Sequence, residues 1–418
     1  MTHPSAPALR PDRTVAELKE LRTLTGTPDG AQRVAFTPTW AAARQWFRDK
    51  LAALPVEVHQ DAGGNLWATL RGVSDRELLI GGHLDSVPNG GWLDGCLNVV
   101  AGLEVLRRLA AAGSPPPVTI RLVDWADEEG ARFGRSLFGS SAASGALVPA
   151  DVRDLTDRDG VRLADAVRNY GIDVERATDA RAELAKAAAY LELHIEQGPV
   201  LEGLGLPMGV VLGTFGVERH AVTFTGQAAH SGSTPMAVRK DALAGVSKLH
   251  LAIRDIAARH GGVCTVGRVT TEPGIVTAVV GQAKMTLDQR HLDPAALAAM
   301  YADARSAGER FAAEEKIEVA WDKLWQIQPF PFHPTLIDLA DAAVREVCGT
   351  SHRLPSGPLH DAAEVCRAGV PTVMLFVQSL RGISHNKIED TREDHLQLSV
   401  RALDRLADKA IAWVAAGG

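Results

Sequence analysis

The chain has 418 residues, a length at which two domains are expected rather than a single core. Its formal net charge of -7 argues against a nucleic-acid binder and against attraction to an anionic membrane surface. Residues 1–20 lack the apolar segment of a signal peptide, and no apolar stretch reaches the ~20 residues of a membrane span. The four cysteines are scattered and form no C-x-x-C pair, so we expect reduced thiols in a cytoplasmic protein.

Helices and strands alternate through the first half of the chain. A helix is predicted at 39–54, where apolar residues recur every three or four positions, and a second one at 97–112. Strands are predicted at 56–58, 66–70, 78–80 and 118–123, and an alanine-rich helix at 182–189 leads into a further strand near His194. Such alternation predicts an α/β fold with a mostly parallel sheet, whose functional residues gather at the strand ends.

The pattern changes near residue 210. The order strand, helix, two strands, helix and strand is predicted at 216–225, 241–260, 263–269, 283–289, 294–314 and 317–324. This order is typical of a ferredoxin-like α+β domain. The first pattern then resumes, with helices at 336–348 and 396–415 and a strand at 371–377. We therefore expect an inserted domain at 213–328, with 1–212 and 329–418 forming the two parts of the other domain.

The stretch from Gly81 to Gly95 is the strongest candidate for a site. A buried strand ends on two glycines, and His83 and Asp85 follow two positions apart. In this arrangement an imidazole can hold a metal ion while the carboxylate accepts its other N–H. Asp94 can reach the same place from the next loop. A lone His-x-Asp more often belongs to a core histidine, and the chain repeats the pattern at His291.

Three further predicted strand ends or loops carry histidine or glutamate. They supply Glu128 with Glu129, His194 and His385. Divalent metals accept imidazole and carboxylate ligands, and two metals ~3.5–4 Å apart can share one carboxylate, for which Asp94 is the candidate. One glutamate of the pair can bind metal while its neighbour serves as a general base. Alone, the glutamate pair is typical of a solvated acidic turn, but its occurrence with the other groups favours a metal site.

These segments resemble the M20 family of dinuclear metallohydrolases, and in particular its hydantoinase/carbamoylase branch. The sequence ELHIEQGPVLE at 192–202 is the most specific piece. The other similar segments are 81–87, 92–95, 127–133, 229–239, 357–362 and 382–389. The resemblance implies a metallopeptidase-like catalytic domain in which the inserted domain is a lid that also dimerises.

The resemblance also assigns roles around two divalent metal ions. It implies one ion held by His83, Asp94 and His194, and another held by Asp94, Glu129 and His385. Glu128 would be the general base, and Asp85 would orient His83. Zinc is the expected metal, with manganese, cobalt and nickel as alternatives.

Five further residues are implied to lie at the substrate. Arg290 matches an arginine that binds the substrate carboxylate, which suits the planar guanidinium fork. His230 matches a lid histidine that reaches the substrate oxyanion across a homodimer, and Gln197 and His360 match residues of the substrate pocket. Thr277 stands where the branch has an asparagine that contacts the carboxylate, and this departure leaves the substrate open.

We therefore expect a metal-dependent amidohydrolase that cleaves the C–N bond of an N-carbamoyl amino acid or of a related ureido or amide carboxylate. An M20 aminoacylase or dipeptidase would share the metals and differ in the acyl group. A protein of another class, a dimeric binder of ligand or metal without catalysis, is the remaining alternative, although an intact Glu128 speaks against it. The sequence does not distinguish carbamoyl-amino acids, β-ureido acids, allantoate and acyl-amino acids.

Overall fold

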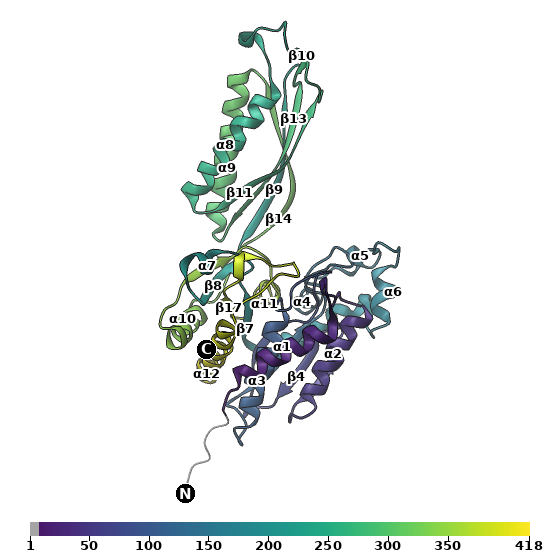
Figure 1. Ribbon diagram of the computed structural model, residues 1–418, viewed down its shortest axis with the longest axis vertical. Coiled ribbons are helices and arrows are strands. Elements are labelled where there is room, and N and C mark those ends of the chain that lie inside the picture. Colours follow the sequence, from purple (N-terminus) through teal and green to yellow (C-terminus); the bar gives the residue numbers. More distant parts are fainter. Residues whose placement is uncertain (1–7) are drawn as a thin grey trace. The chain divides into compact units, whose positions relative to one another are not determined.

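The computed structural model describes residues 8–418, which divide into two units (Figure 1). The main unit contains the described residues up to Leu212 together with Phe332–Gly418, and the inserted unit is Gly213–Pro331. Within residues 8–418, none of the helices is long and apolar enough to cross a bilayer.

The main unit is built on a sheet with the strand order β8-β17-β7-β5-β6-β4-β3. Its three central pairings, β17 with β7, β7 with β5 and β5 with β6, are parallel, and the pairings nearer the edges are antiparallel. The bounds are β3 Glu57–Gln60, β4 Leu66–Leu70, β5 Ser74–His83, β6 Val118–Trp125, β7 Ala187–Ile195, β8 Met208–Thr214 and β17 Thr372–Val377. Apolar runs buried on both faces favour this parallel centre, and the predicted α/β fold is confirmed.

Helices cover this sheet. Thr37 caps the second helix by accepting the Trp40 N–H, and Pro38 occupies its first turn, where no N–H is needed. The helices are α1 Pro11–Thr25, α2 Pro38–Leu51, α3 Cys96–Ala110, α4 Phe138–Ser144, α5 Pro149–Val152, α6 Leu163–Arg168, α7 Val200–Leu204, α10 Pro334–Cys348, α11 Asp361–Arg367 and α12 Glu393–Ala415. Shorter pieces are the strands β1 Gly26–Thr27, β2 Gly30–Ala31 and β16 Arg353–Ser356 and the 3-10 helices η1 Val174–Leu184 and η3 Leu380–Gly382.

The main departure from the sequence-based expectation is at 182–189. The predicted helix there is wrong, because a 3-10 helix ends at Leu184 and strand β7 begins at Ala187. Alanine favours a helix only weakly, and pairing with β5 and β17 on both sides outweighs that preference. Strand β8 and helix α1 were not predicted.

The inserted unit has the predicted ferredoxin-like arrangement. A four-stranded antiparallel sheet with the order β11-β13-β9-β14 is covered on one face by α8 and α9 (Figure 1). The bounds are β9 Gly216–Thr225, α8 Ala242–His260, β11 Val263–Glu272, β13 Gln282–His291, α9 Pro294–Glu315 and β14 Glu318–Ile327. Phe224, Leu249, Met285 and Met300 form the centre of its own core. Smaller elements are β10 Ala229–His230, β12 Ala278–Val279, η2 Met236–Val238 and β15 Phe330–Pro331.

Candidate active site

The parallel strands of the main unit bring its candidate ligands to one edge of the sheet. Strand β5 ends at His83, β7 ends one residue after His194, and β6 ends at Trp125, just before Glu128 and Glu129. Because the carboxyl ends of parallel strands meet at the same edge, residues more than a hundred positions apart become neighbours.

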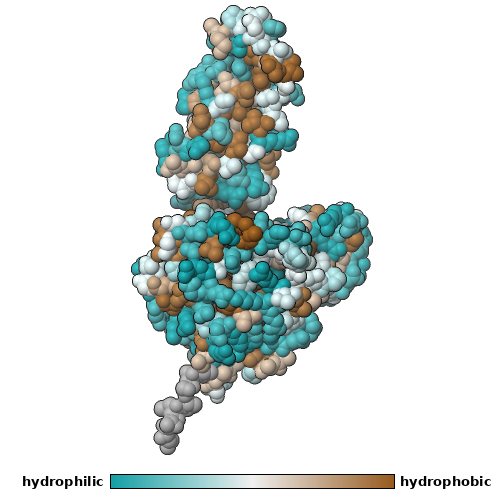
Figure 2. Space-filling view, in the orientation of Figure 1, coloured by the Kyte–Doolittle hydropathy of each residue, from teal (hydrophilic) through white to brown (hydrophobic). Residues whose placement is uncertain are grey.

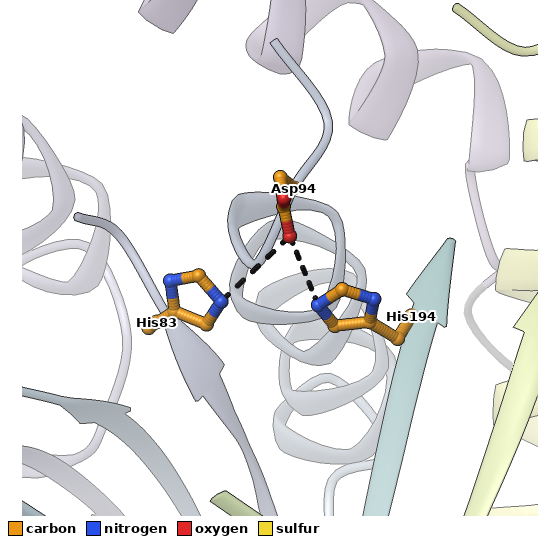
Figure 3. Close-up of side chains that lie close together, drawn as sticks. All are labelled: His83, Asp94 and His194. Carbon is orange, nitrogen blue, oxygen red and sulfur yellow. Dashed lines mark ion pairs between the residues drawn. The ribbon is translucent and has the colours of Figure 1, made fainter. Parts of the chain in front are cut away.

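A first group consists of His83, Asp94 and His194 (Figure 3). Asp94 Oδ1 lies 3.9 Å from His83 Nε2 and 3.1 Å from His194 Nε2. Each histidine bonds a backbone carbonyl through Nδ1, at 3.1 Å for His83 and 2.8 Å for His194, which leaves Nε2 as the ring atom that faces the carboxylate. Both Nε2 atoms are buried and form no hydrogen bond within residues 8–418. Buried nitrogens without hydrogen-bond partners beside a carboxylate are what a divalent metal requires.

A second group contains Asp94, Glu129 and His385. His385 Nε2 lies 3.3 Å from Asp94 Oδ2 and 3.3 Å from Glu129 Oε2. Glu129 Oε1 is buried and is not hydrogen-bonded in the described part of the chain. Asp94 therefore belongs to both groups and offers one carboxylate oxygen to each.

Glu128 stands beside the first group without being part of it. Its Oε2 lies 3.7 Å from His83 Nε2, and burial raises the pKa of the Glu128 carboxyl well above its usual range. Asp85 accepts the backbone N–H groups of Glu128 at 3.2 Å and Glu129 at 3.1 Å. Its Oδ1 is also 3.5 Å from His83 Nδ1, although the hydrogen bond of that nitrogen goes to the Asp85 carbonyl. Asp85 thus holds the two glutamates as well as the histidine.

Gly95 makes room for this arrangement. It precedes α3 with a φ of 66°, a conformation that side chains rarely adopt, and a Cβ there would lie 2.3 Å from the His83 ring. The glycine after Asp94 therefore lets the loop pass directly over the histidine.

Glu389 was missed by reasoning from the sequence. Its Oε1 accepts the backbone N–H groups of Leu93 and Asp94, both at 3.1 Å, and its Oε2 accepts the Ser384 hydroxyl at 2.8 Å. Burial raises the pKa of Glu389 to about 7. This carboxyl joins the loop of Asp94 to the loop of His385. Its position in a charged run of sequence carries no signal of such a role.

Gln197 and His360 lie within the same region. Gln197 Nε2 donates to Asp94 Oδ2 at 2.9 Å, so the amide contacts the carboxylate shared by both groups. His360 is buried, with its ring centroid 4.4 Å from that of His194 and its Nε2 3.0 Å from Ser356 Oγ. Burial lowers the pKa of His360 well below its usual range, so the ring is neutral.

The remaining candidates lie in the inserted unit. His230 is exposed, and its Nδ1 accepts the backbone N–H groups of Gly232 and Ser233, both at 3.1 Å. The ring proton is therefore on Nε2, which can donate outward. The Thr277 carbonyl accepts the Ser231 N–H at 3.0 Å and supports this turn. Arg290 Nε lies 2.8 Å from Asp288 Oδ1.

The repeated His-x-Asp at His291 has a structural role. The His291 Nδ1 accepts the Asp293 N–H at 2.8 Å, and its Nε2 lies 3.0 Å from the His260 carbonyl oxygen. The Asp293 carboxylate caps α9 by accepting the Ala295 N–H at 2.7 Å. Both ring nitrogens are therefore used within the fold.

Comparison with known proteins identifies the family of the chain. The model of peptidase family M20/M25/M40 matches residues 79–409. The chain is 33% identical over 388 residues to N-carbamoyl-L-amino acid amidohydrolase of Geobacillus stearothermophilus, covering 92% of this chain and 94% of the relative. It is 34% identical over 392 residues to allantoate amidohydrolase of Escherichia coli strain K12, covering 92% and 93%.

Solved structures give the same result. A hydantoinase/carbamoylase family amidase from Burkholderia ambifaria superposes with a TM-score of 0.85 at 33% identity, covering 95% of both chains. Peptidases and amidohydrolases alike break C–N bonds by hydrolysis. The chain belongs to peptidase family M20/M25/M40 and is a hydrolase that acts on C–N bonds.

Proposed function

We propose that this enzyme hydrolyses the C–N bond of N-carbamoyl amino acids or closely related ureido carboxylates, using two divalent metal ions. The observation that carries the proposal is the position of Asp94 between two groups of ligands, with its two oxygens 3.1 Å from His194 Nε2 and 3.3 Å from His385 Nε2. The similarity to an N-carbamoyl-L-amino acid amidohydrolase and to an allantoate amidohydrolase, each over 92% of this chain, supports the ureido substrate class.

The donor set suits zinc or a similar ion. His83 and His194 would hold one ion with Asp94, and Glu129 and His385 would hold the other with the same aspartate. Such ions polarise a carbonyl oxygen and lower the pKa of water toward ~7.

Glu128 is the proposed general base. Its buried carboxylate would take a proton from the water that adds to the carbonyl carbon of the substrate. When the C–N bond breaks, the same carboxyl would return that proton to the leaving nitrogen.

We assign substrate contacts to the inserted unit, which we propose is a lid and dimerisation domain. Arg290 would bind the substrate carboxylate, and Thr277 and the pocket residues Gln197 and His360 would complete its recognition. His230 would donate from Nε2 to the developing oxyanion of a second copy, a term worth ~3–4 kcal/mol in a well-studied protease.

An exposed apolar strip supports a homodimer. Strand β11 is an edge of the inserted sheet. The groove beside it is lined by the apolar residues Leu243, Val246, Leu251, Val266 and Val269, together with Ser247, His250, Gly267 and Arg268. Leu251 is 66% exposed and Val269 44% exposed. In Figure 2, hydrophobic residues are visible on the surface of this unit. An open strand edge next to apolar side chains suits pairing with the same edge of a second copy.

Cys96, Cys264 and Cys348 form no disulfide. Free thiols are typical of a reducing compartment, and we propose a cytoplasmic location.

A substrate panel tests the proposal. Metal-reconstituted enzyme is assayed for released ammonia and free amine on N-carbamoyl-L-amino acids, β-ureido acids, allantoate and N-acyl-amino acids. We expect turnover of a ureido substrate at least tenfold faster than of any N-acyl-amino acid. Preference for an acyl-amino acid would overturn the proposal. Allantoate is the second candidate because the allantoate amidohydrolase is as similar as the carbamoylase, at 34% against 33% identity.

A further inference from the structure

A buried carboxylate outside both ligand groups of the proposed metal centre connects three segments of the active site. Glu192 lies on β7 two positions before His194, so the two side chains leave the same face of the strand. Glu192 is 1% exposed. A carboxylate buried to this degree costs free energy unless hydrogen bonds compensate it.

Two of those hydrogen bonds come from different elements. Glu192 Oε2 accepts the Tyr190 hydroxyl at 2.7 Å and the Ala362 backbone N–H at 3.0 Å. The Tyr190 hydroxyl in turn accepts the Trp125 indole N–H at 3.0 Å. The chain of hydrogen bonds therefore runs from the end of β6, just before the catalytic glutamates, through β7 to the first turn of α11.

The neighbouring strand leaves space for this chain. A Cβ on Gly81 in β5 would lie 2.7 Å from the Tyr190 ring, closer than side chains pack. Glycine at this position leaves room for the tyrosine ring, whose hydroxyl donates to Glu192.

The bond to Ala362 fixes the loop that carries His360. His360 precedes α11 with an extended backbone, and its side chain makes no cap for that helix. Glu192 instead caps the helix by accepting the Ala362 N–H. The His360 ring contacts the ring of His194, with centroids 4.4 Å apart, and that of Phe376, with centroids 5.9 Å apart, and its Nε2 lies 3.0 Å from Ser356 Oγ.

We infer that Glu192 is a positioning residue that sets the place of His360 beside His194. The inference rests on the proposed function, in which His360 contacts the substrate. The metal ligands have their own supports, since His194 bonds the Ile195 carbonyl and His83 bonds the Asp85 carbonyl. Glu192 also lies near His194 and His360, with one ligand atom from each residue within 4.8 Å of the others. Because His83, Asp94 and His194 form the first group without Glu192, we expect loss of its carboxylate to displace His360 and to leave the metal content unchanged.

Glu192→Ala and Glu192→Gln distinguish this role from general stabilisation. Glutamine keeps an oxygen that can accept both hydrogen bonds, so Glu192→Gln should stay within about threefold of the wild-type kcat/KM. Glu192→Ala should lose about 10–100-fold, mainly through KM, at unchanged metal content. In a double-mutant cycle, Glu192→Ala should cost little once His360→Ala is present, because both changes remove the same contact.

Crystal structures of the two Glu192 variants give a readout that is independent of turnover. We expect the His360 ring to leave its place beside His194 in Glu192→Ala and to keep it in Glu192→Gln. A His360 ring that stays in place in Glu192→Ala, additive losses in the cycle, or metal loss in Glu192→Ala would each overturn the inference. Wild-type enzyme that turns over no ureido substrate would instead overturn the proposed function.

If Glu192→Ala does not fold, Tyr190→Phe takes its place. It removes one of the two hydrogen bonds to Oε2, and a smaller rise in KM is expected at constant metal content. A Tyr190→Phe enzyme with wild-type KM would then contradict the inference.

Discussion

Asp94 faces His194 with one carboxylate oxygen, at 3.1 Å, and His385 with the other, at 3.3 Å. The two histidines come from β7 and from a loop near the C-terminus, so one short side chain connects distant parts of the chain. Gln197 and Glu389 hold this aspartate by its side chain and its backbone, respectively. The arrangement gives the enzyme a central carboxylate whose direction is fixed from several sides.

Glu128→Gln tests the general base. Glutamine has nearly the same shape but cannot take a proton, so kcat should fall about 10²–10⁴-fold while the metal content stays that of the wild type. Steady-state kinetics with metal analysis on the same samples gives both values. Glu202→Gln, on the exposed side of α7, is the matched control and should be fully active. An active Glu128→Gln enzyme with normal metal content would assign the base elsewhere.

The proposed action of His230 across the dimer can be tested with a heterodimer whose two subunits carry different substitutions. A heterodimer of one Glu128→Gln subunit and one His230→Ala subunit, co-expressed with two different tags, has one intact site if His230 acts across the dimer. Its activity should be about half that of the wild-type dimer, because the other site carries both lesions. If His230 acts within its own subunit, both sites are damaged and the heterodimer is no better than its parents.

Arg290→Lys tests recognition of the substrate carboxylate. Lysine keeps the charge and loses the two-pronged geometry, so KM should rise about tenfold or more with a smaller effect on kcat. Arg219→Lys is a close control, because Arg219 also pairs with Asp288, at 2.8 Å, from the adjacent strand. Equal effects of the two substitutions would show that Asp288, rather than the substrate, is the important partner of Arg290.

Arg44→Ala tests how much the buried ion pair between Arg44 and Asp124 contributes to stability. Arg44 Nε lies 2.6 Å from Asp124 Oδ2, both side chains are buried, and the other Asp124 oxygen accepts the Leu84 N–H at 2.8 Å. Removing the guanidinium leaves a buried charge unpaired and should cost about 3–5 kcal/mol of unfolding free energy in urea. Arg71→Ala, which breaks an exposed pair with Glu57, should leave the urea midpoint nearly unchanged. A similar small shift for Arg44→Ala would contradict this account.

The sequence predicts most of the fold and the strand ends that carry the candidate site, but it does not predict the residues that support the site. Apolar runs followed by polar residues are local signals, so the strand ends at His83, Glu128 and His194 could be located from composition and spacing. The inserted unit could be predicted because its helices and strands keep strong periodicity. The helix predicted for the alanine-rich segment 182–189 was wrong. Helix propensity depends on the local sequence alone, whereas strand β7 is stabilised by pairing with β5 and β17, which lie far away in the sequence.

The supporting residues could not be found in this way. Glu389 and Glu192 act through backbone N–H groups of segments 295 and 170 residues away. Such bonds depend on tertiary packing and leave no periodic pattern. The Gln197 contact with Asp94 is a similar case, because the family resemblance implies a role for Gln197 in the substrate pocket and gives no indication of this hydrogen bond.

The most direct test of the proposed metal centre is the metal content of purified protein after reconstitution and gel filtration. The wild type should hold about two ions per chain, His385→Ala about one, and Asp94→Ala almost none, because Asp94 serves both groups. Asp293→Ala, in the repeated motif, should keep about two. An Asp94→Ala protein that folds and still holds two ions would contradict the shared carboxylate on which the account depends.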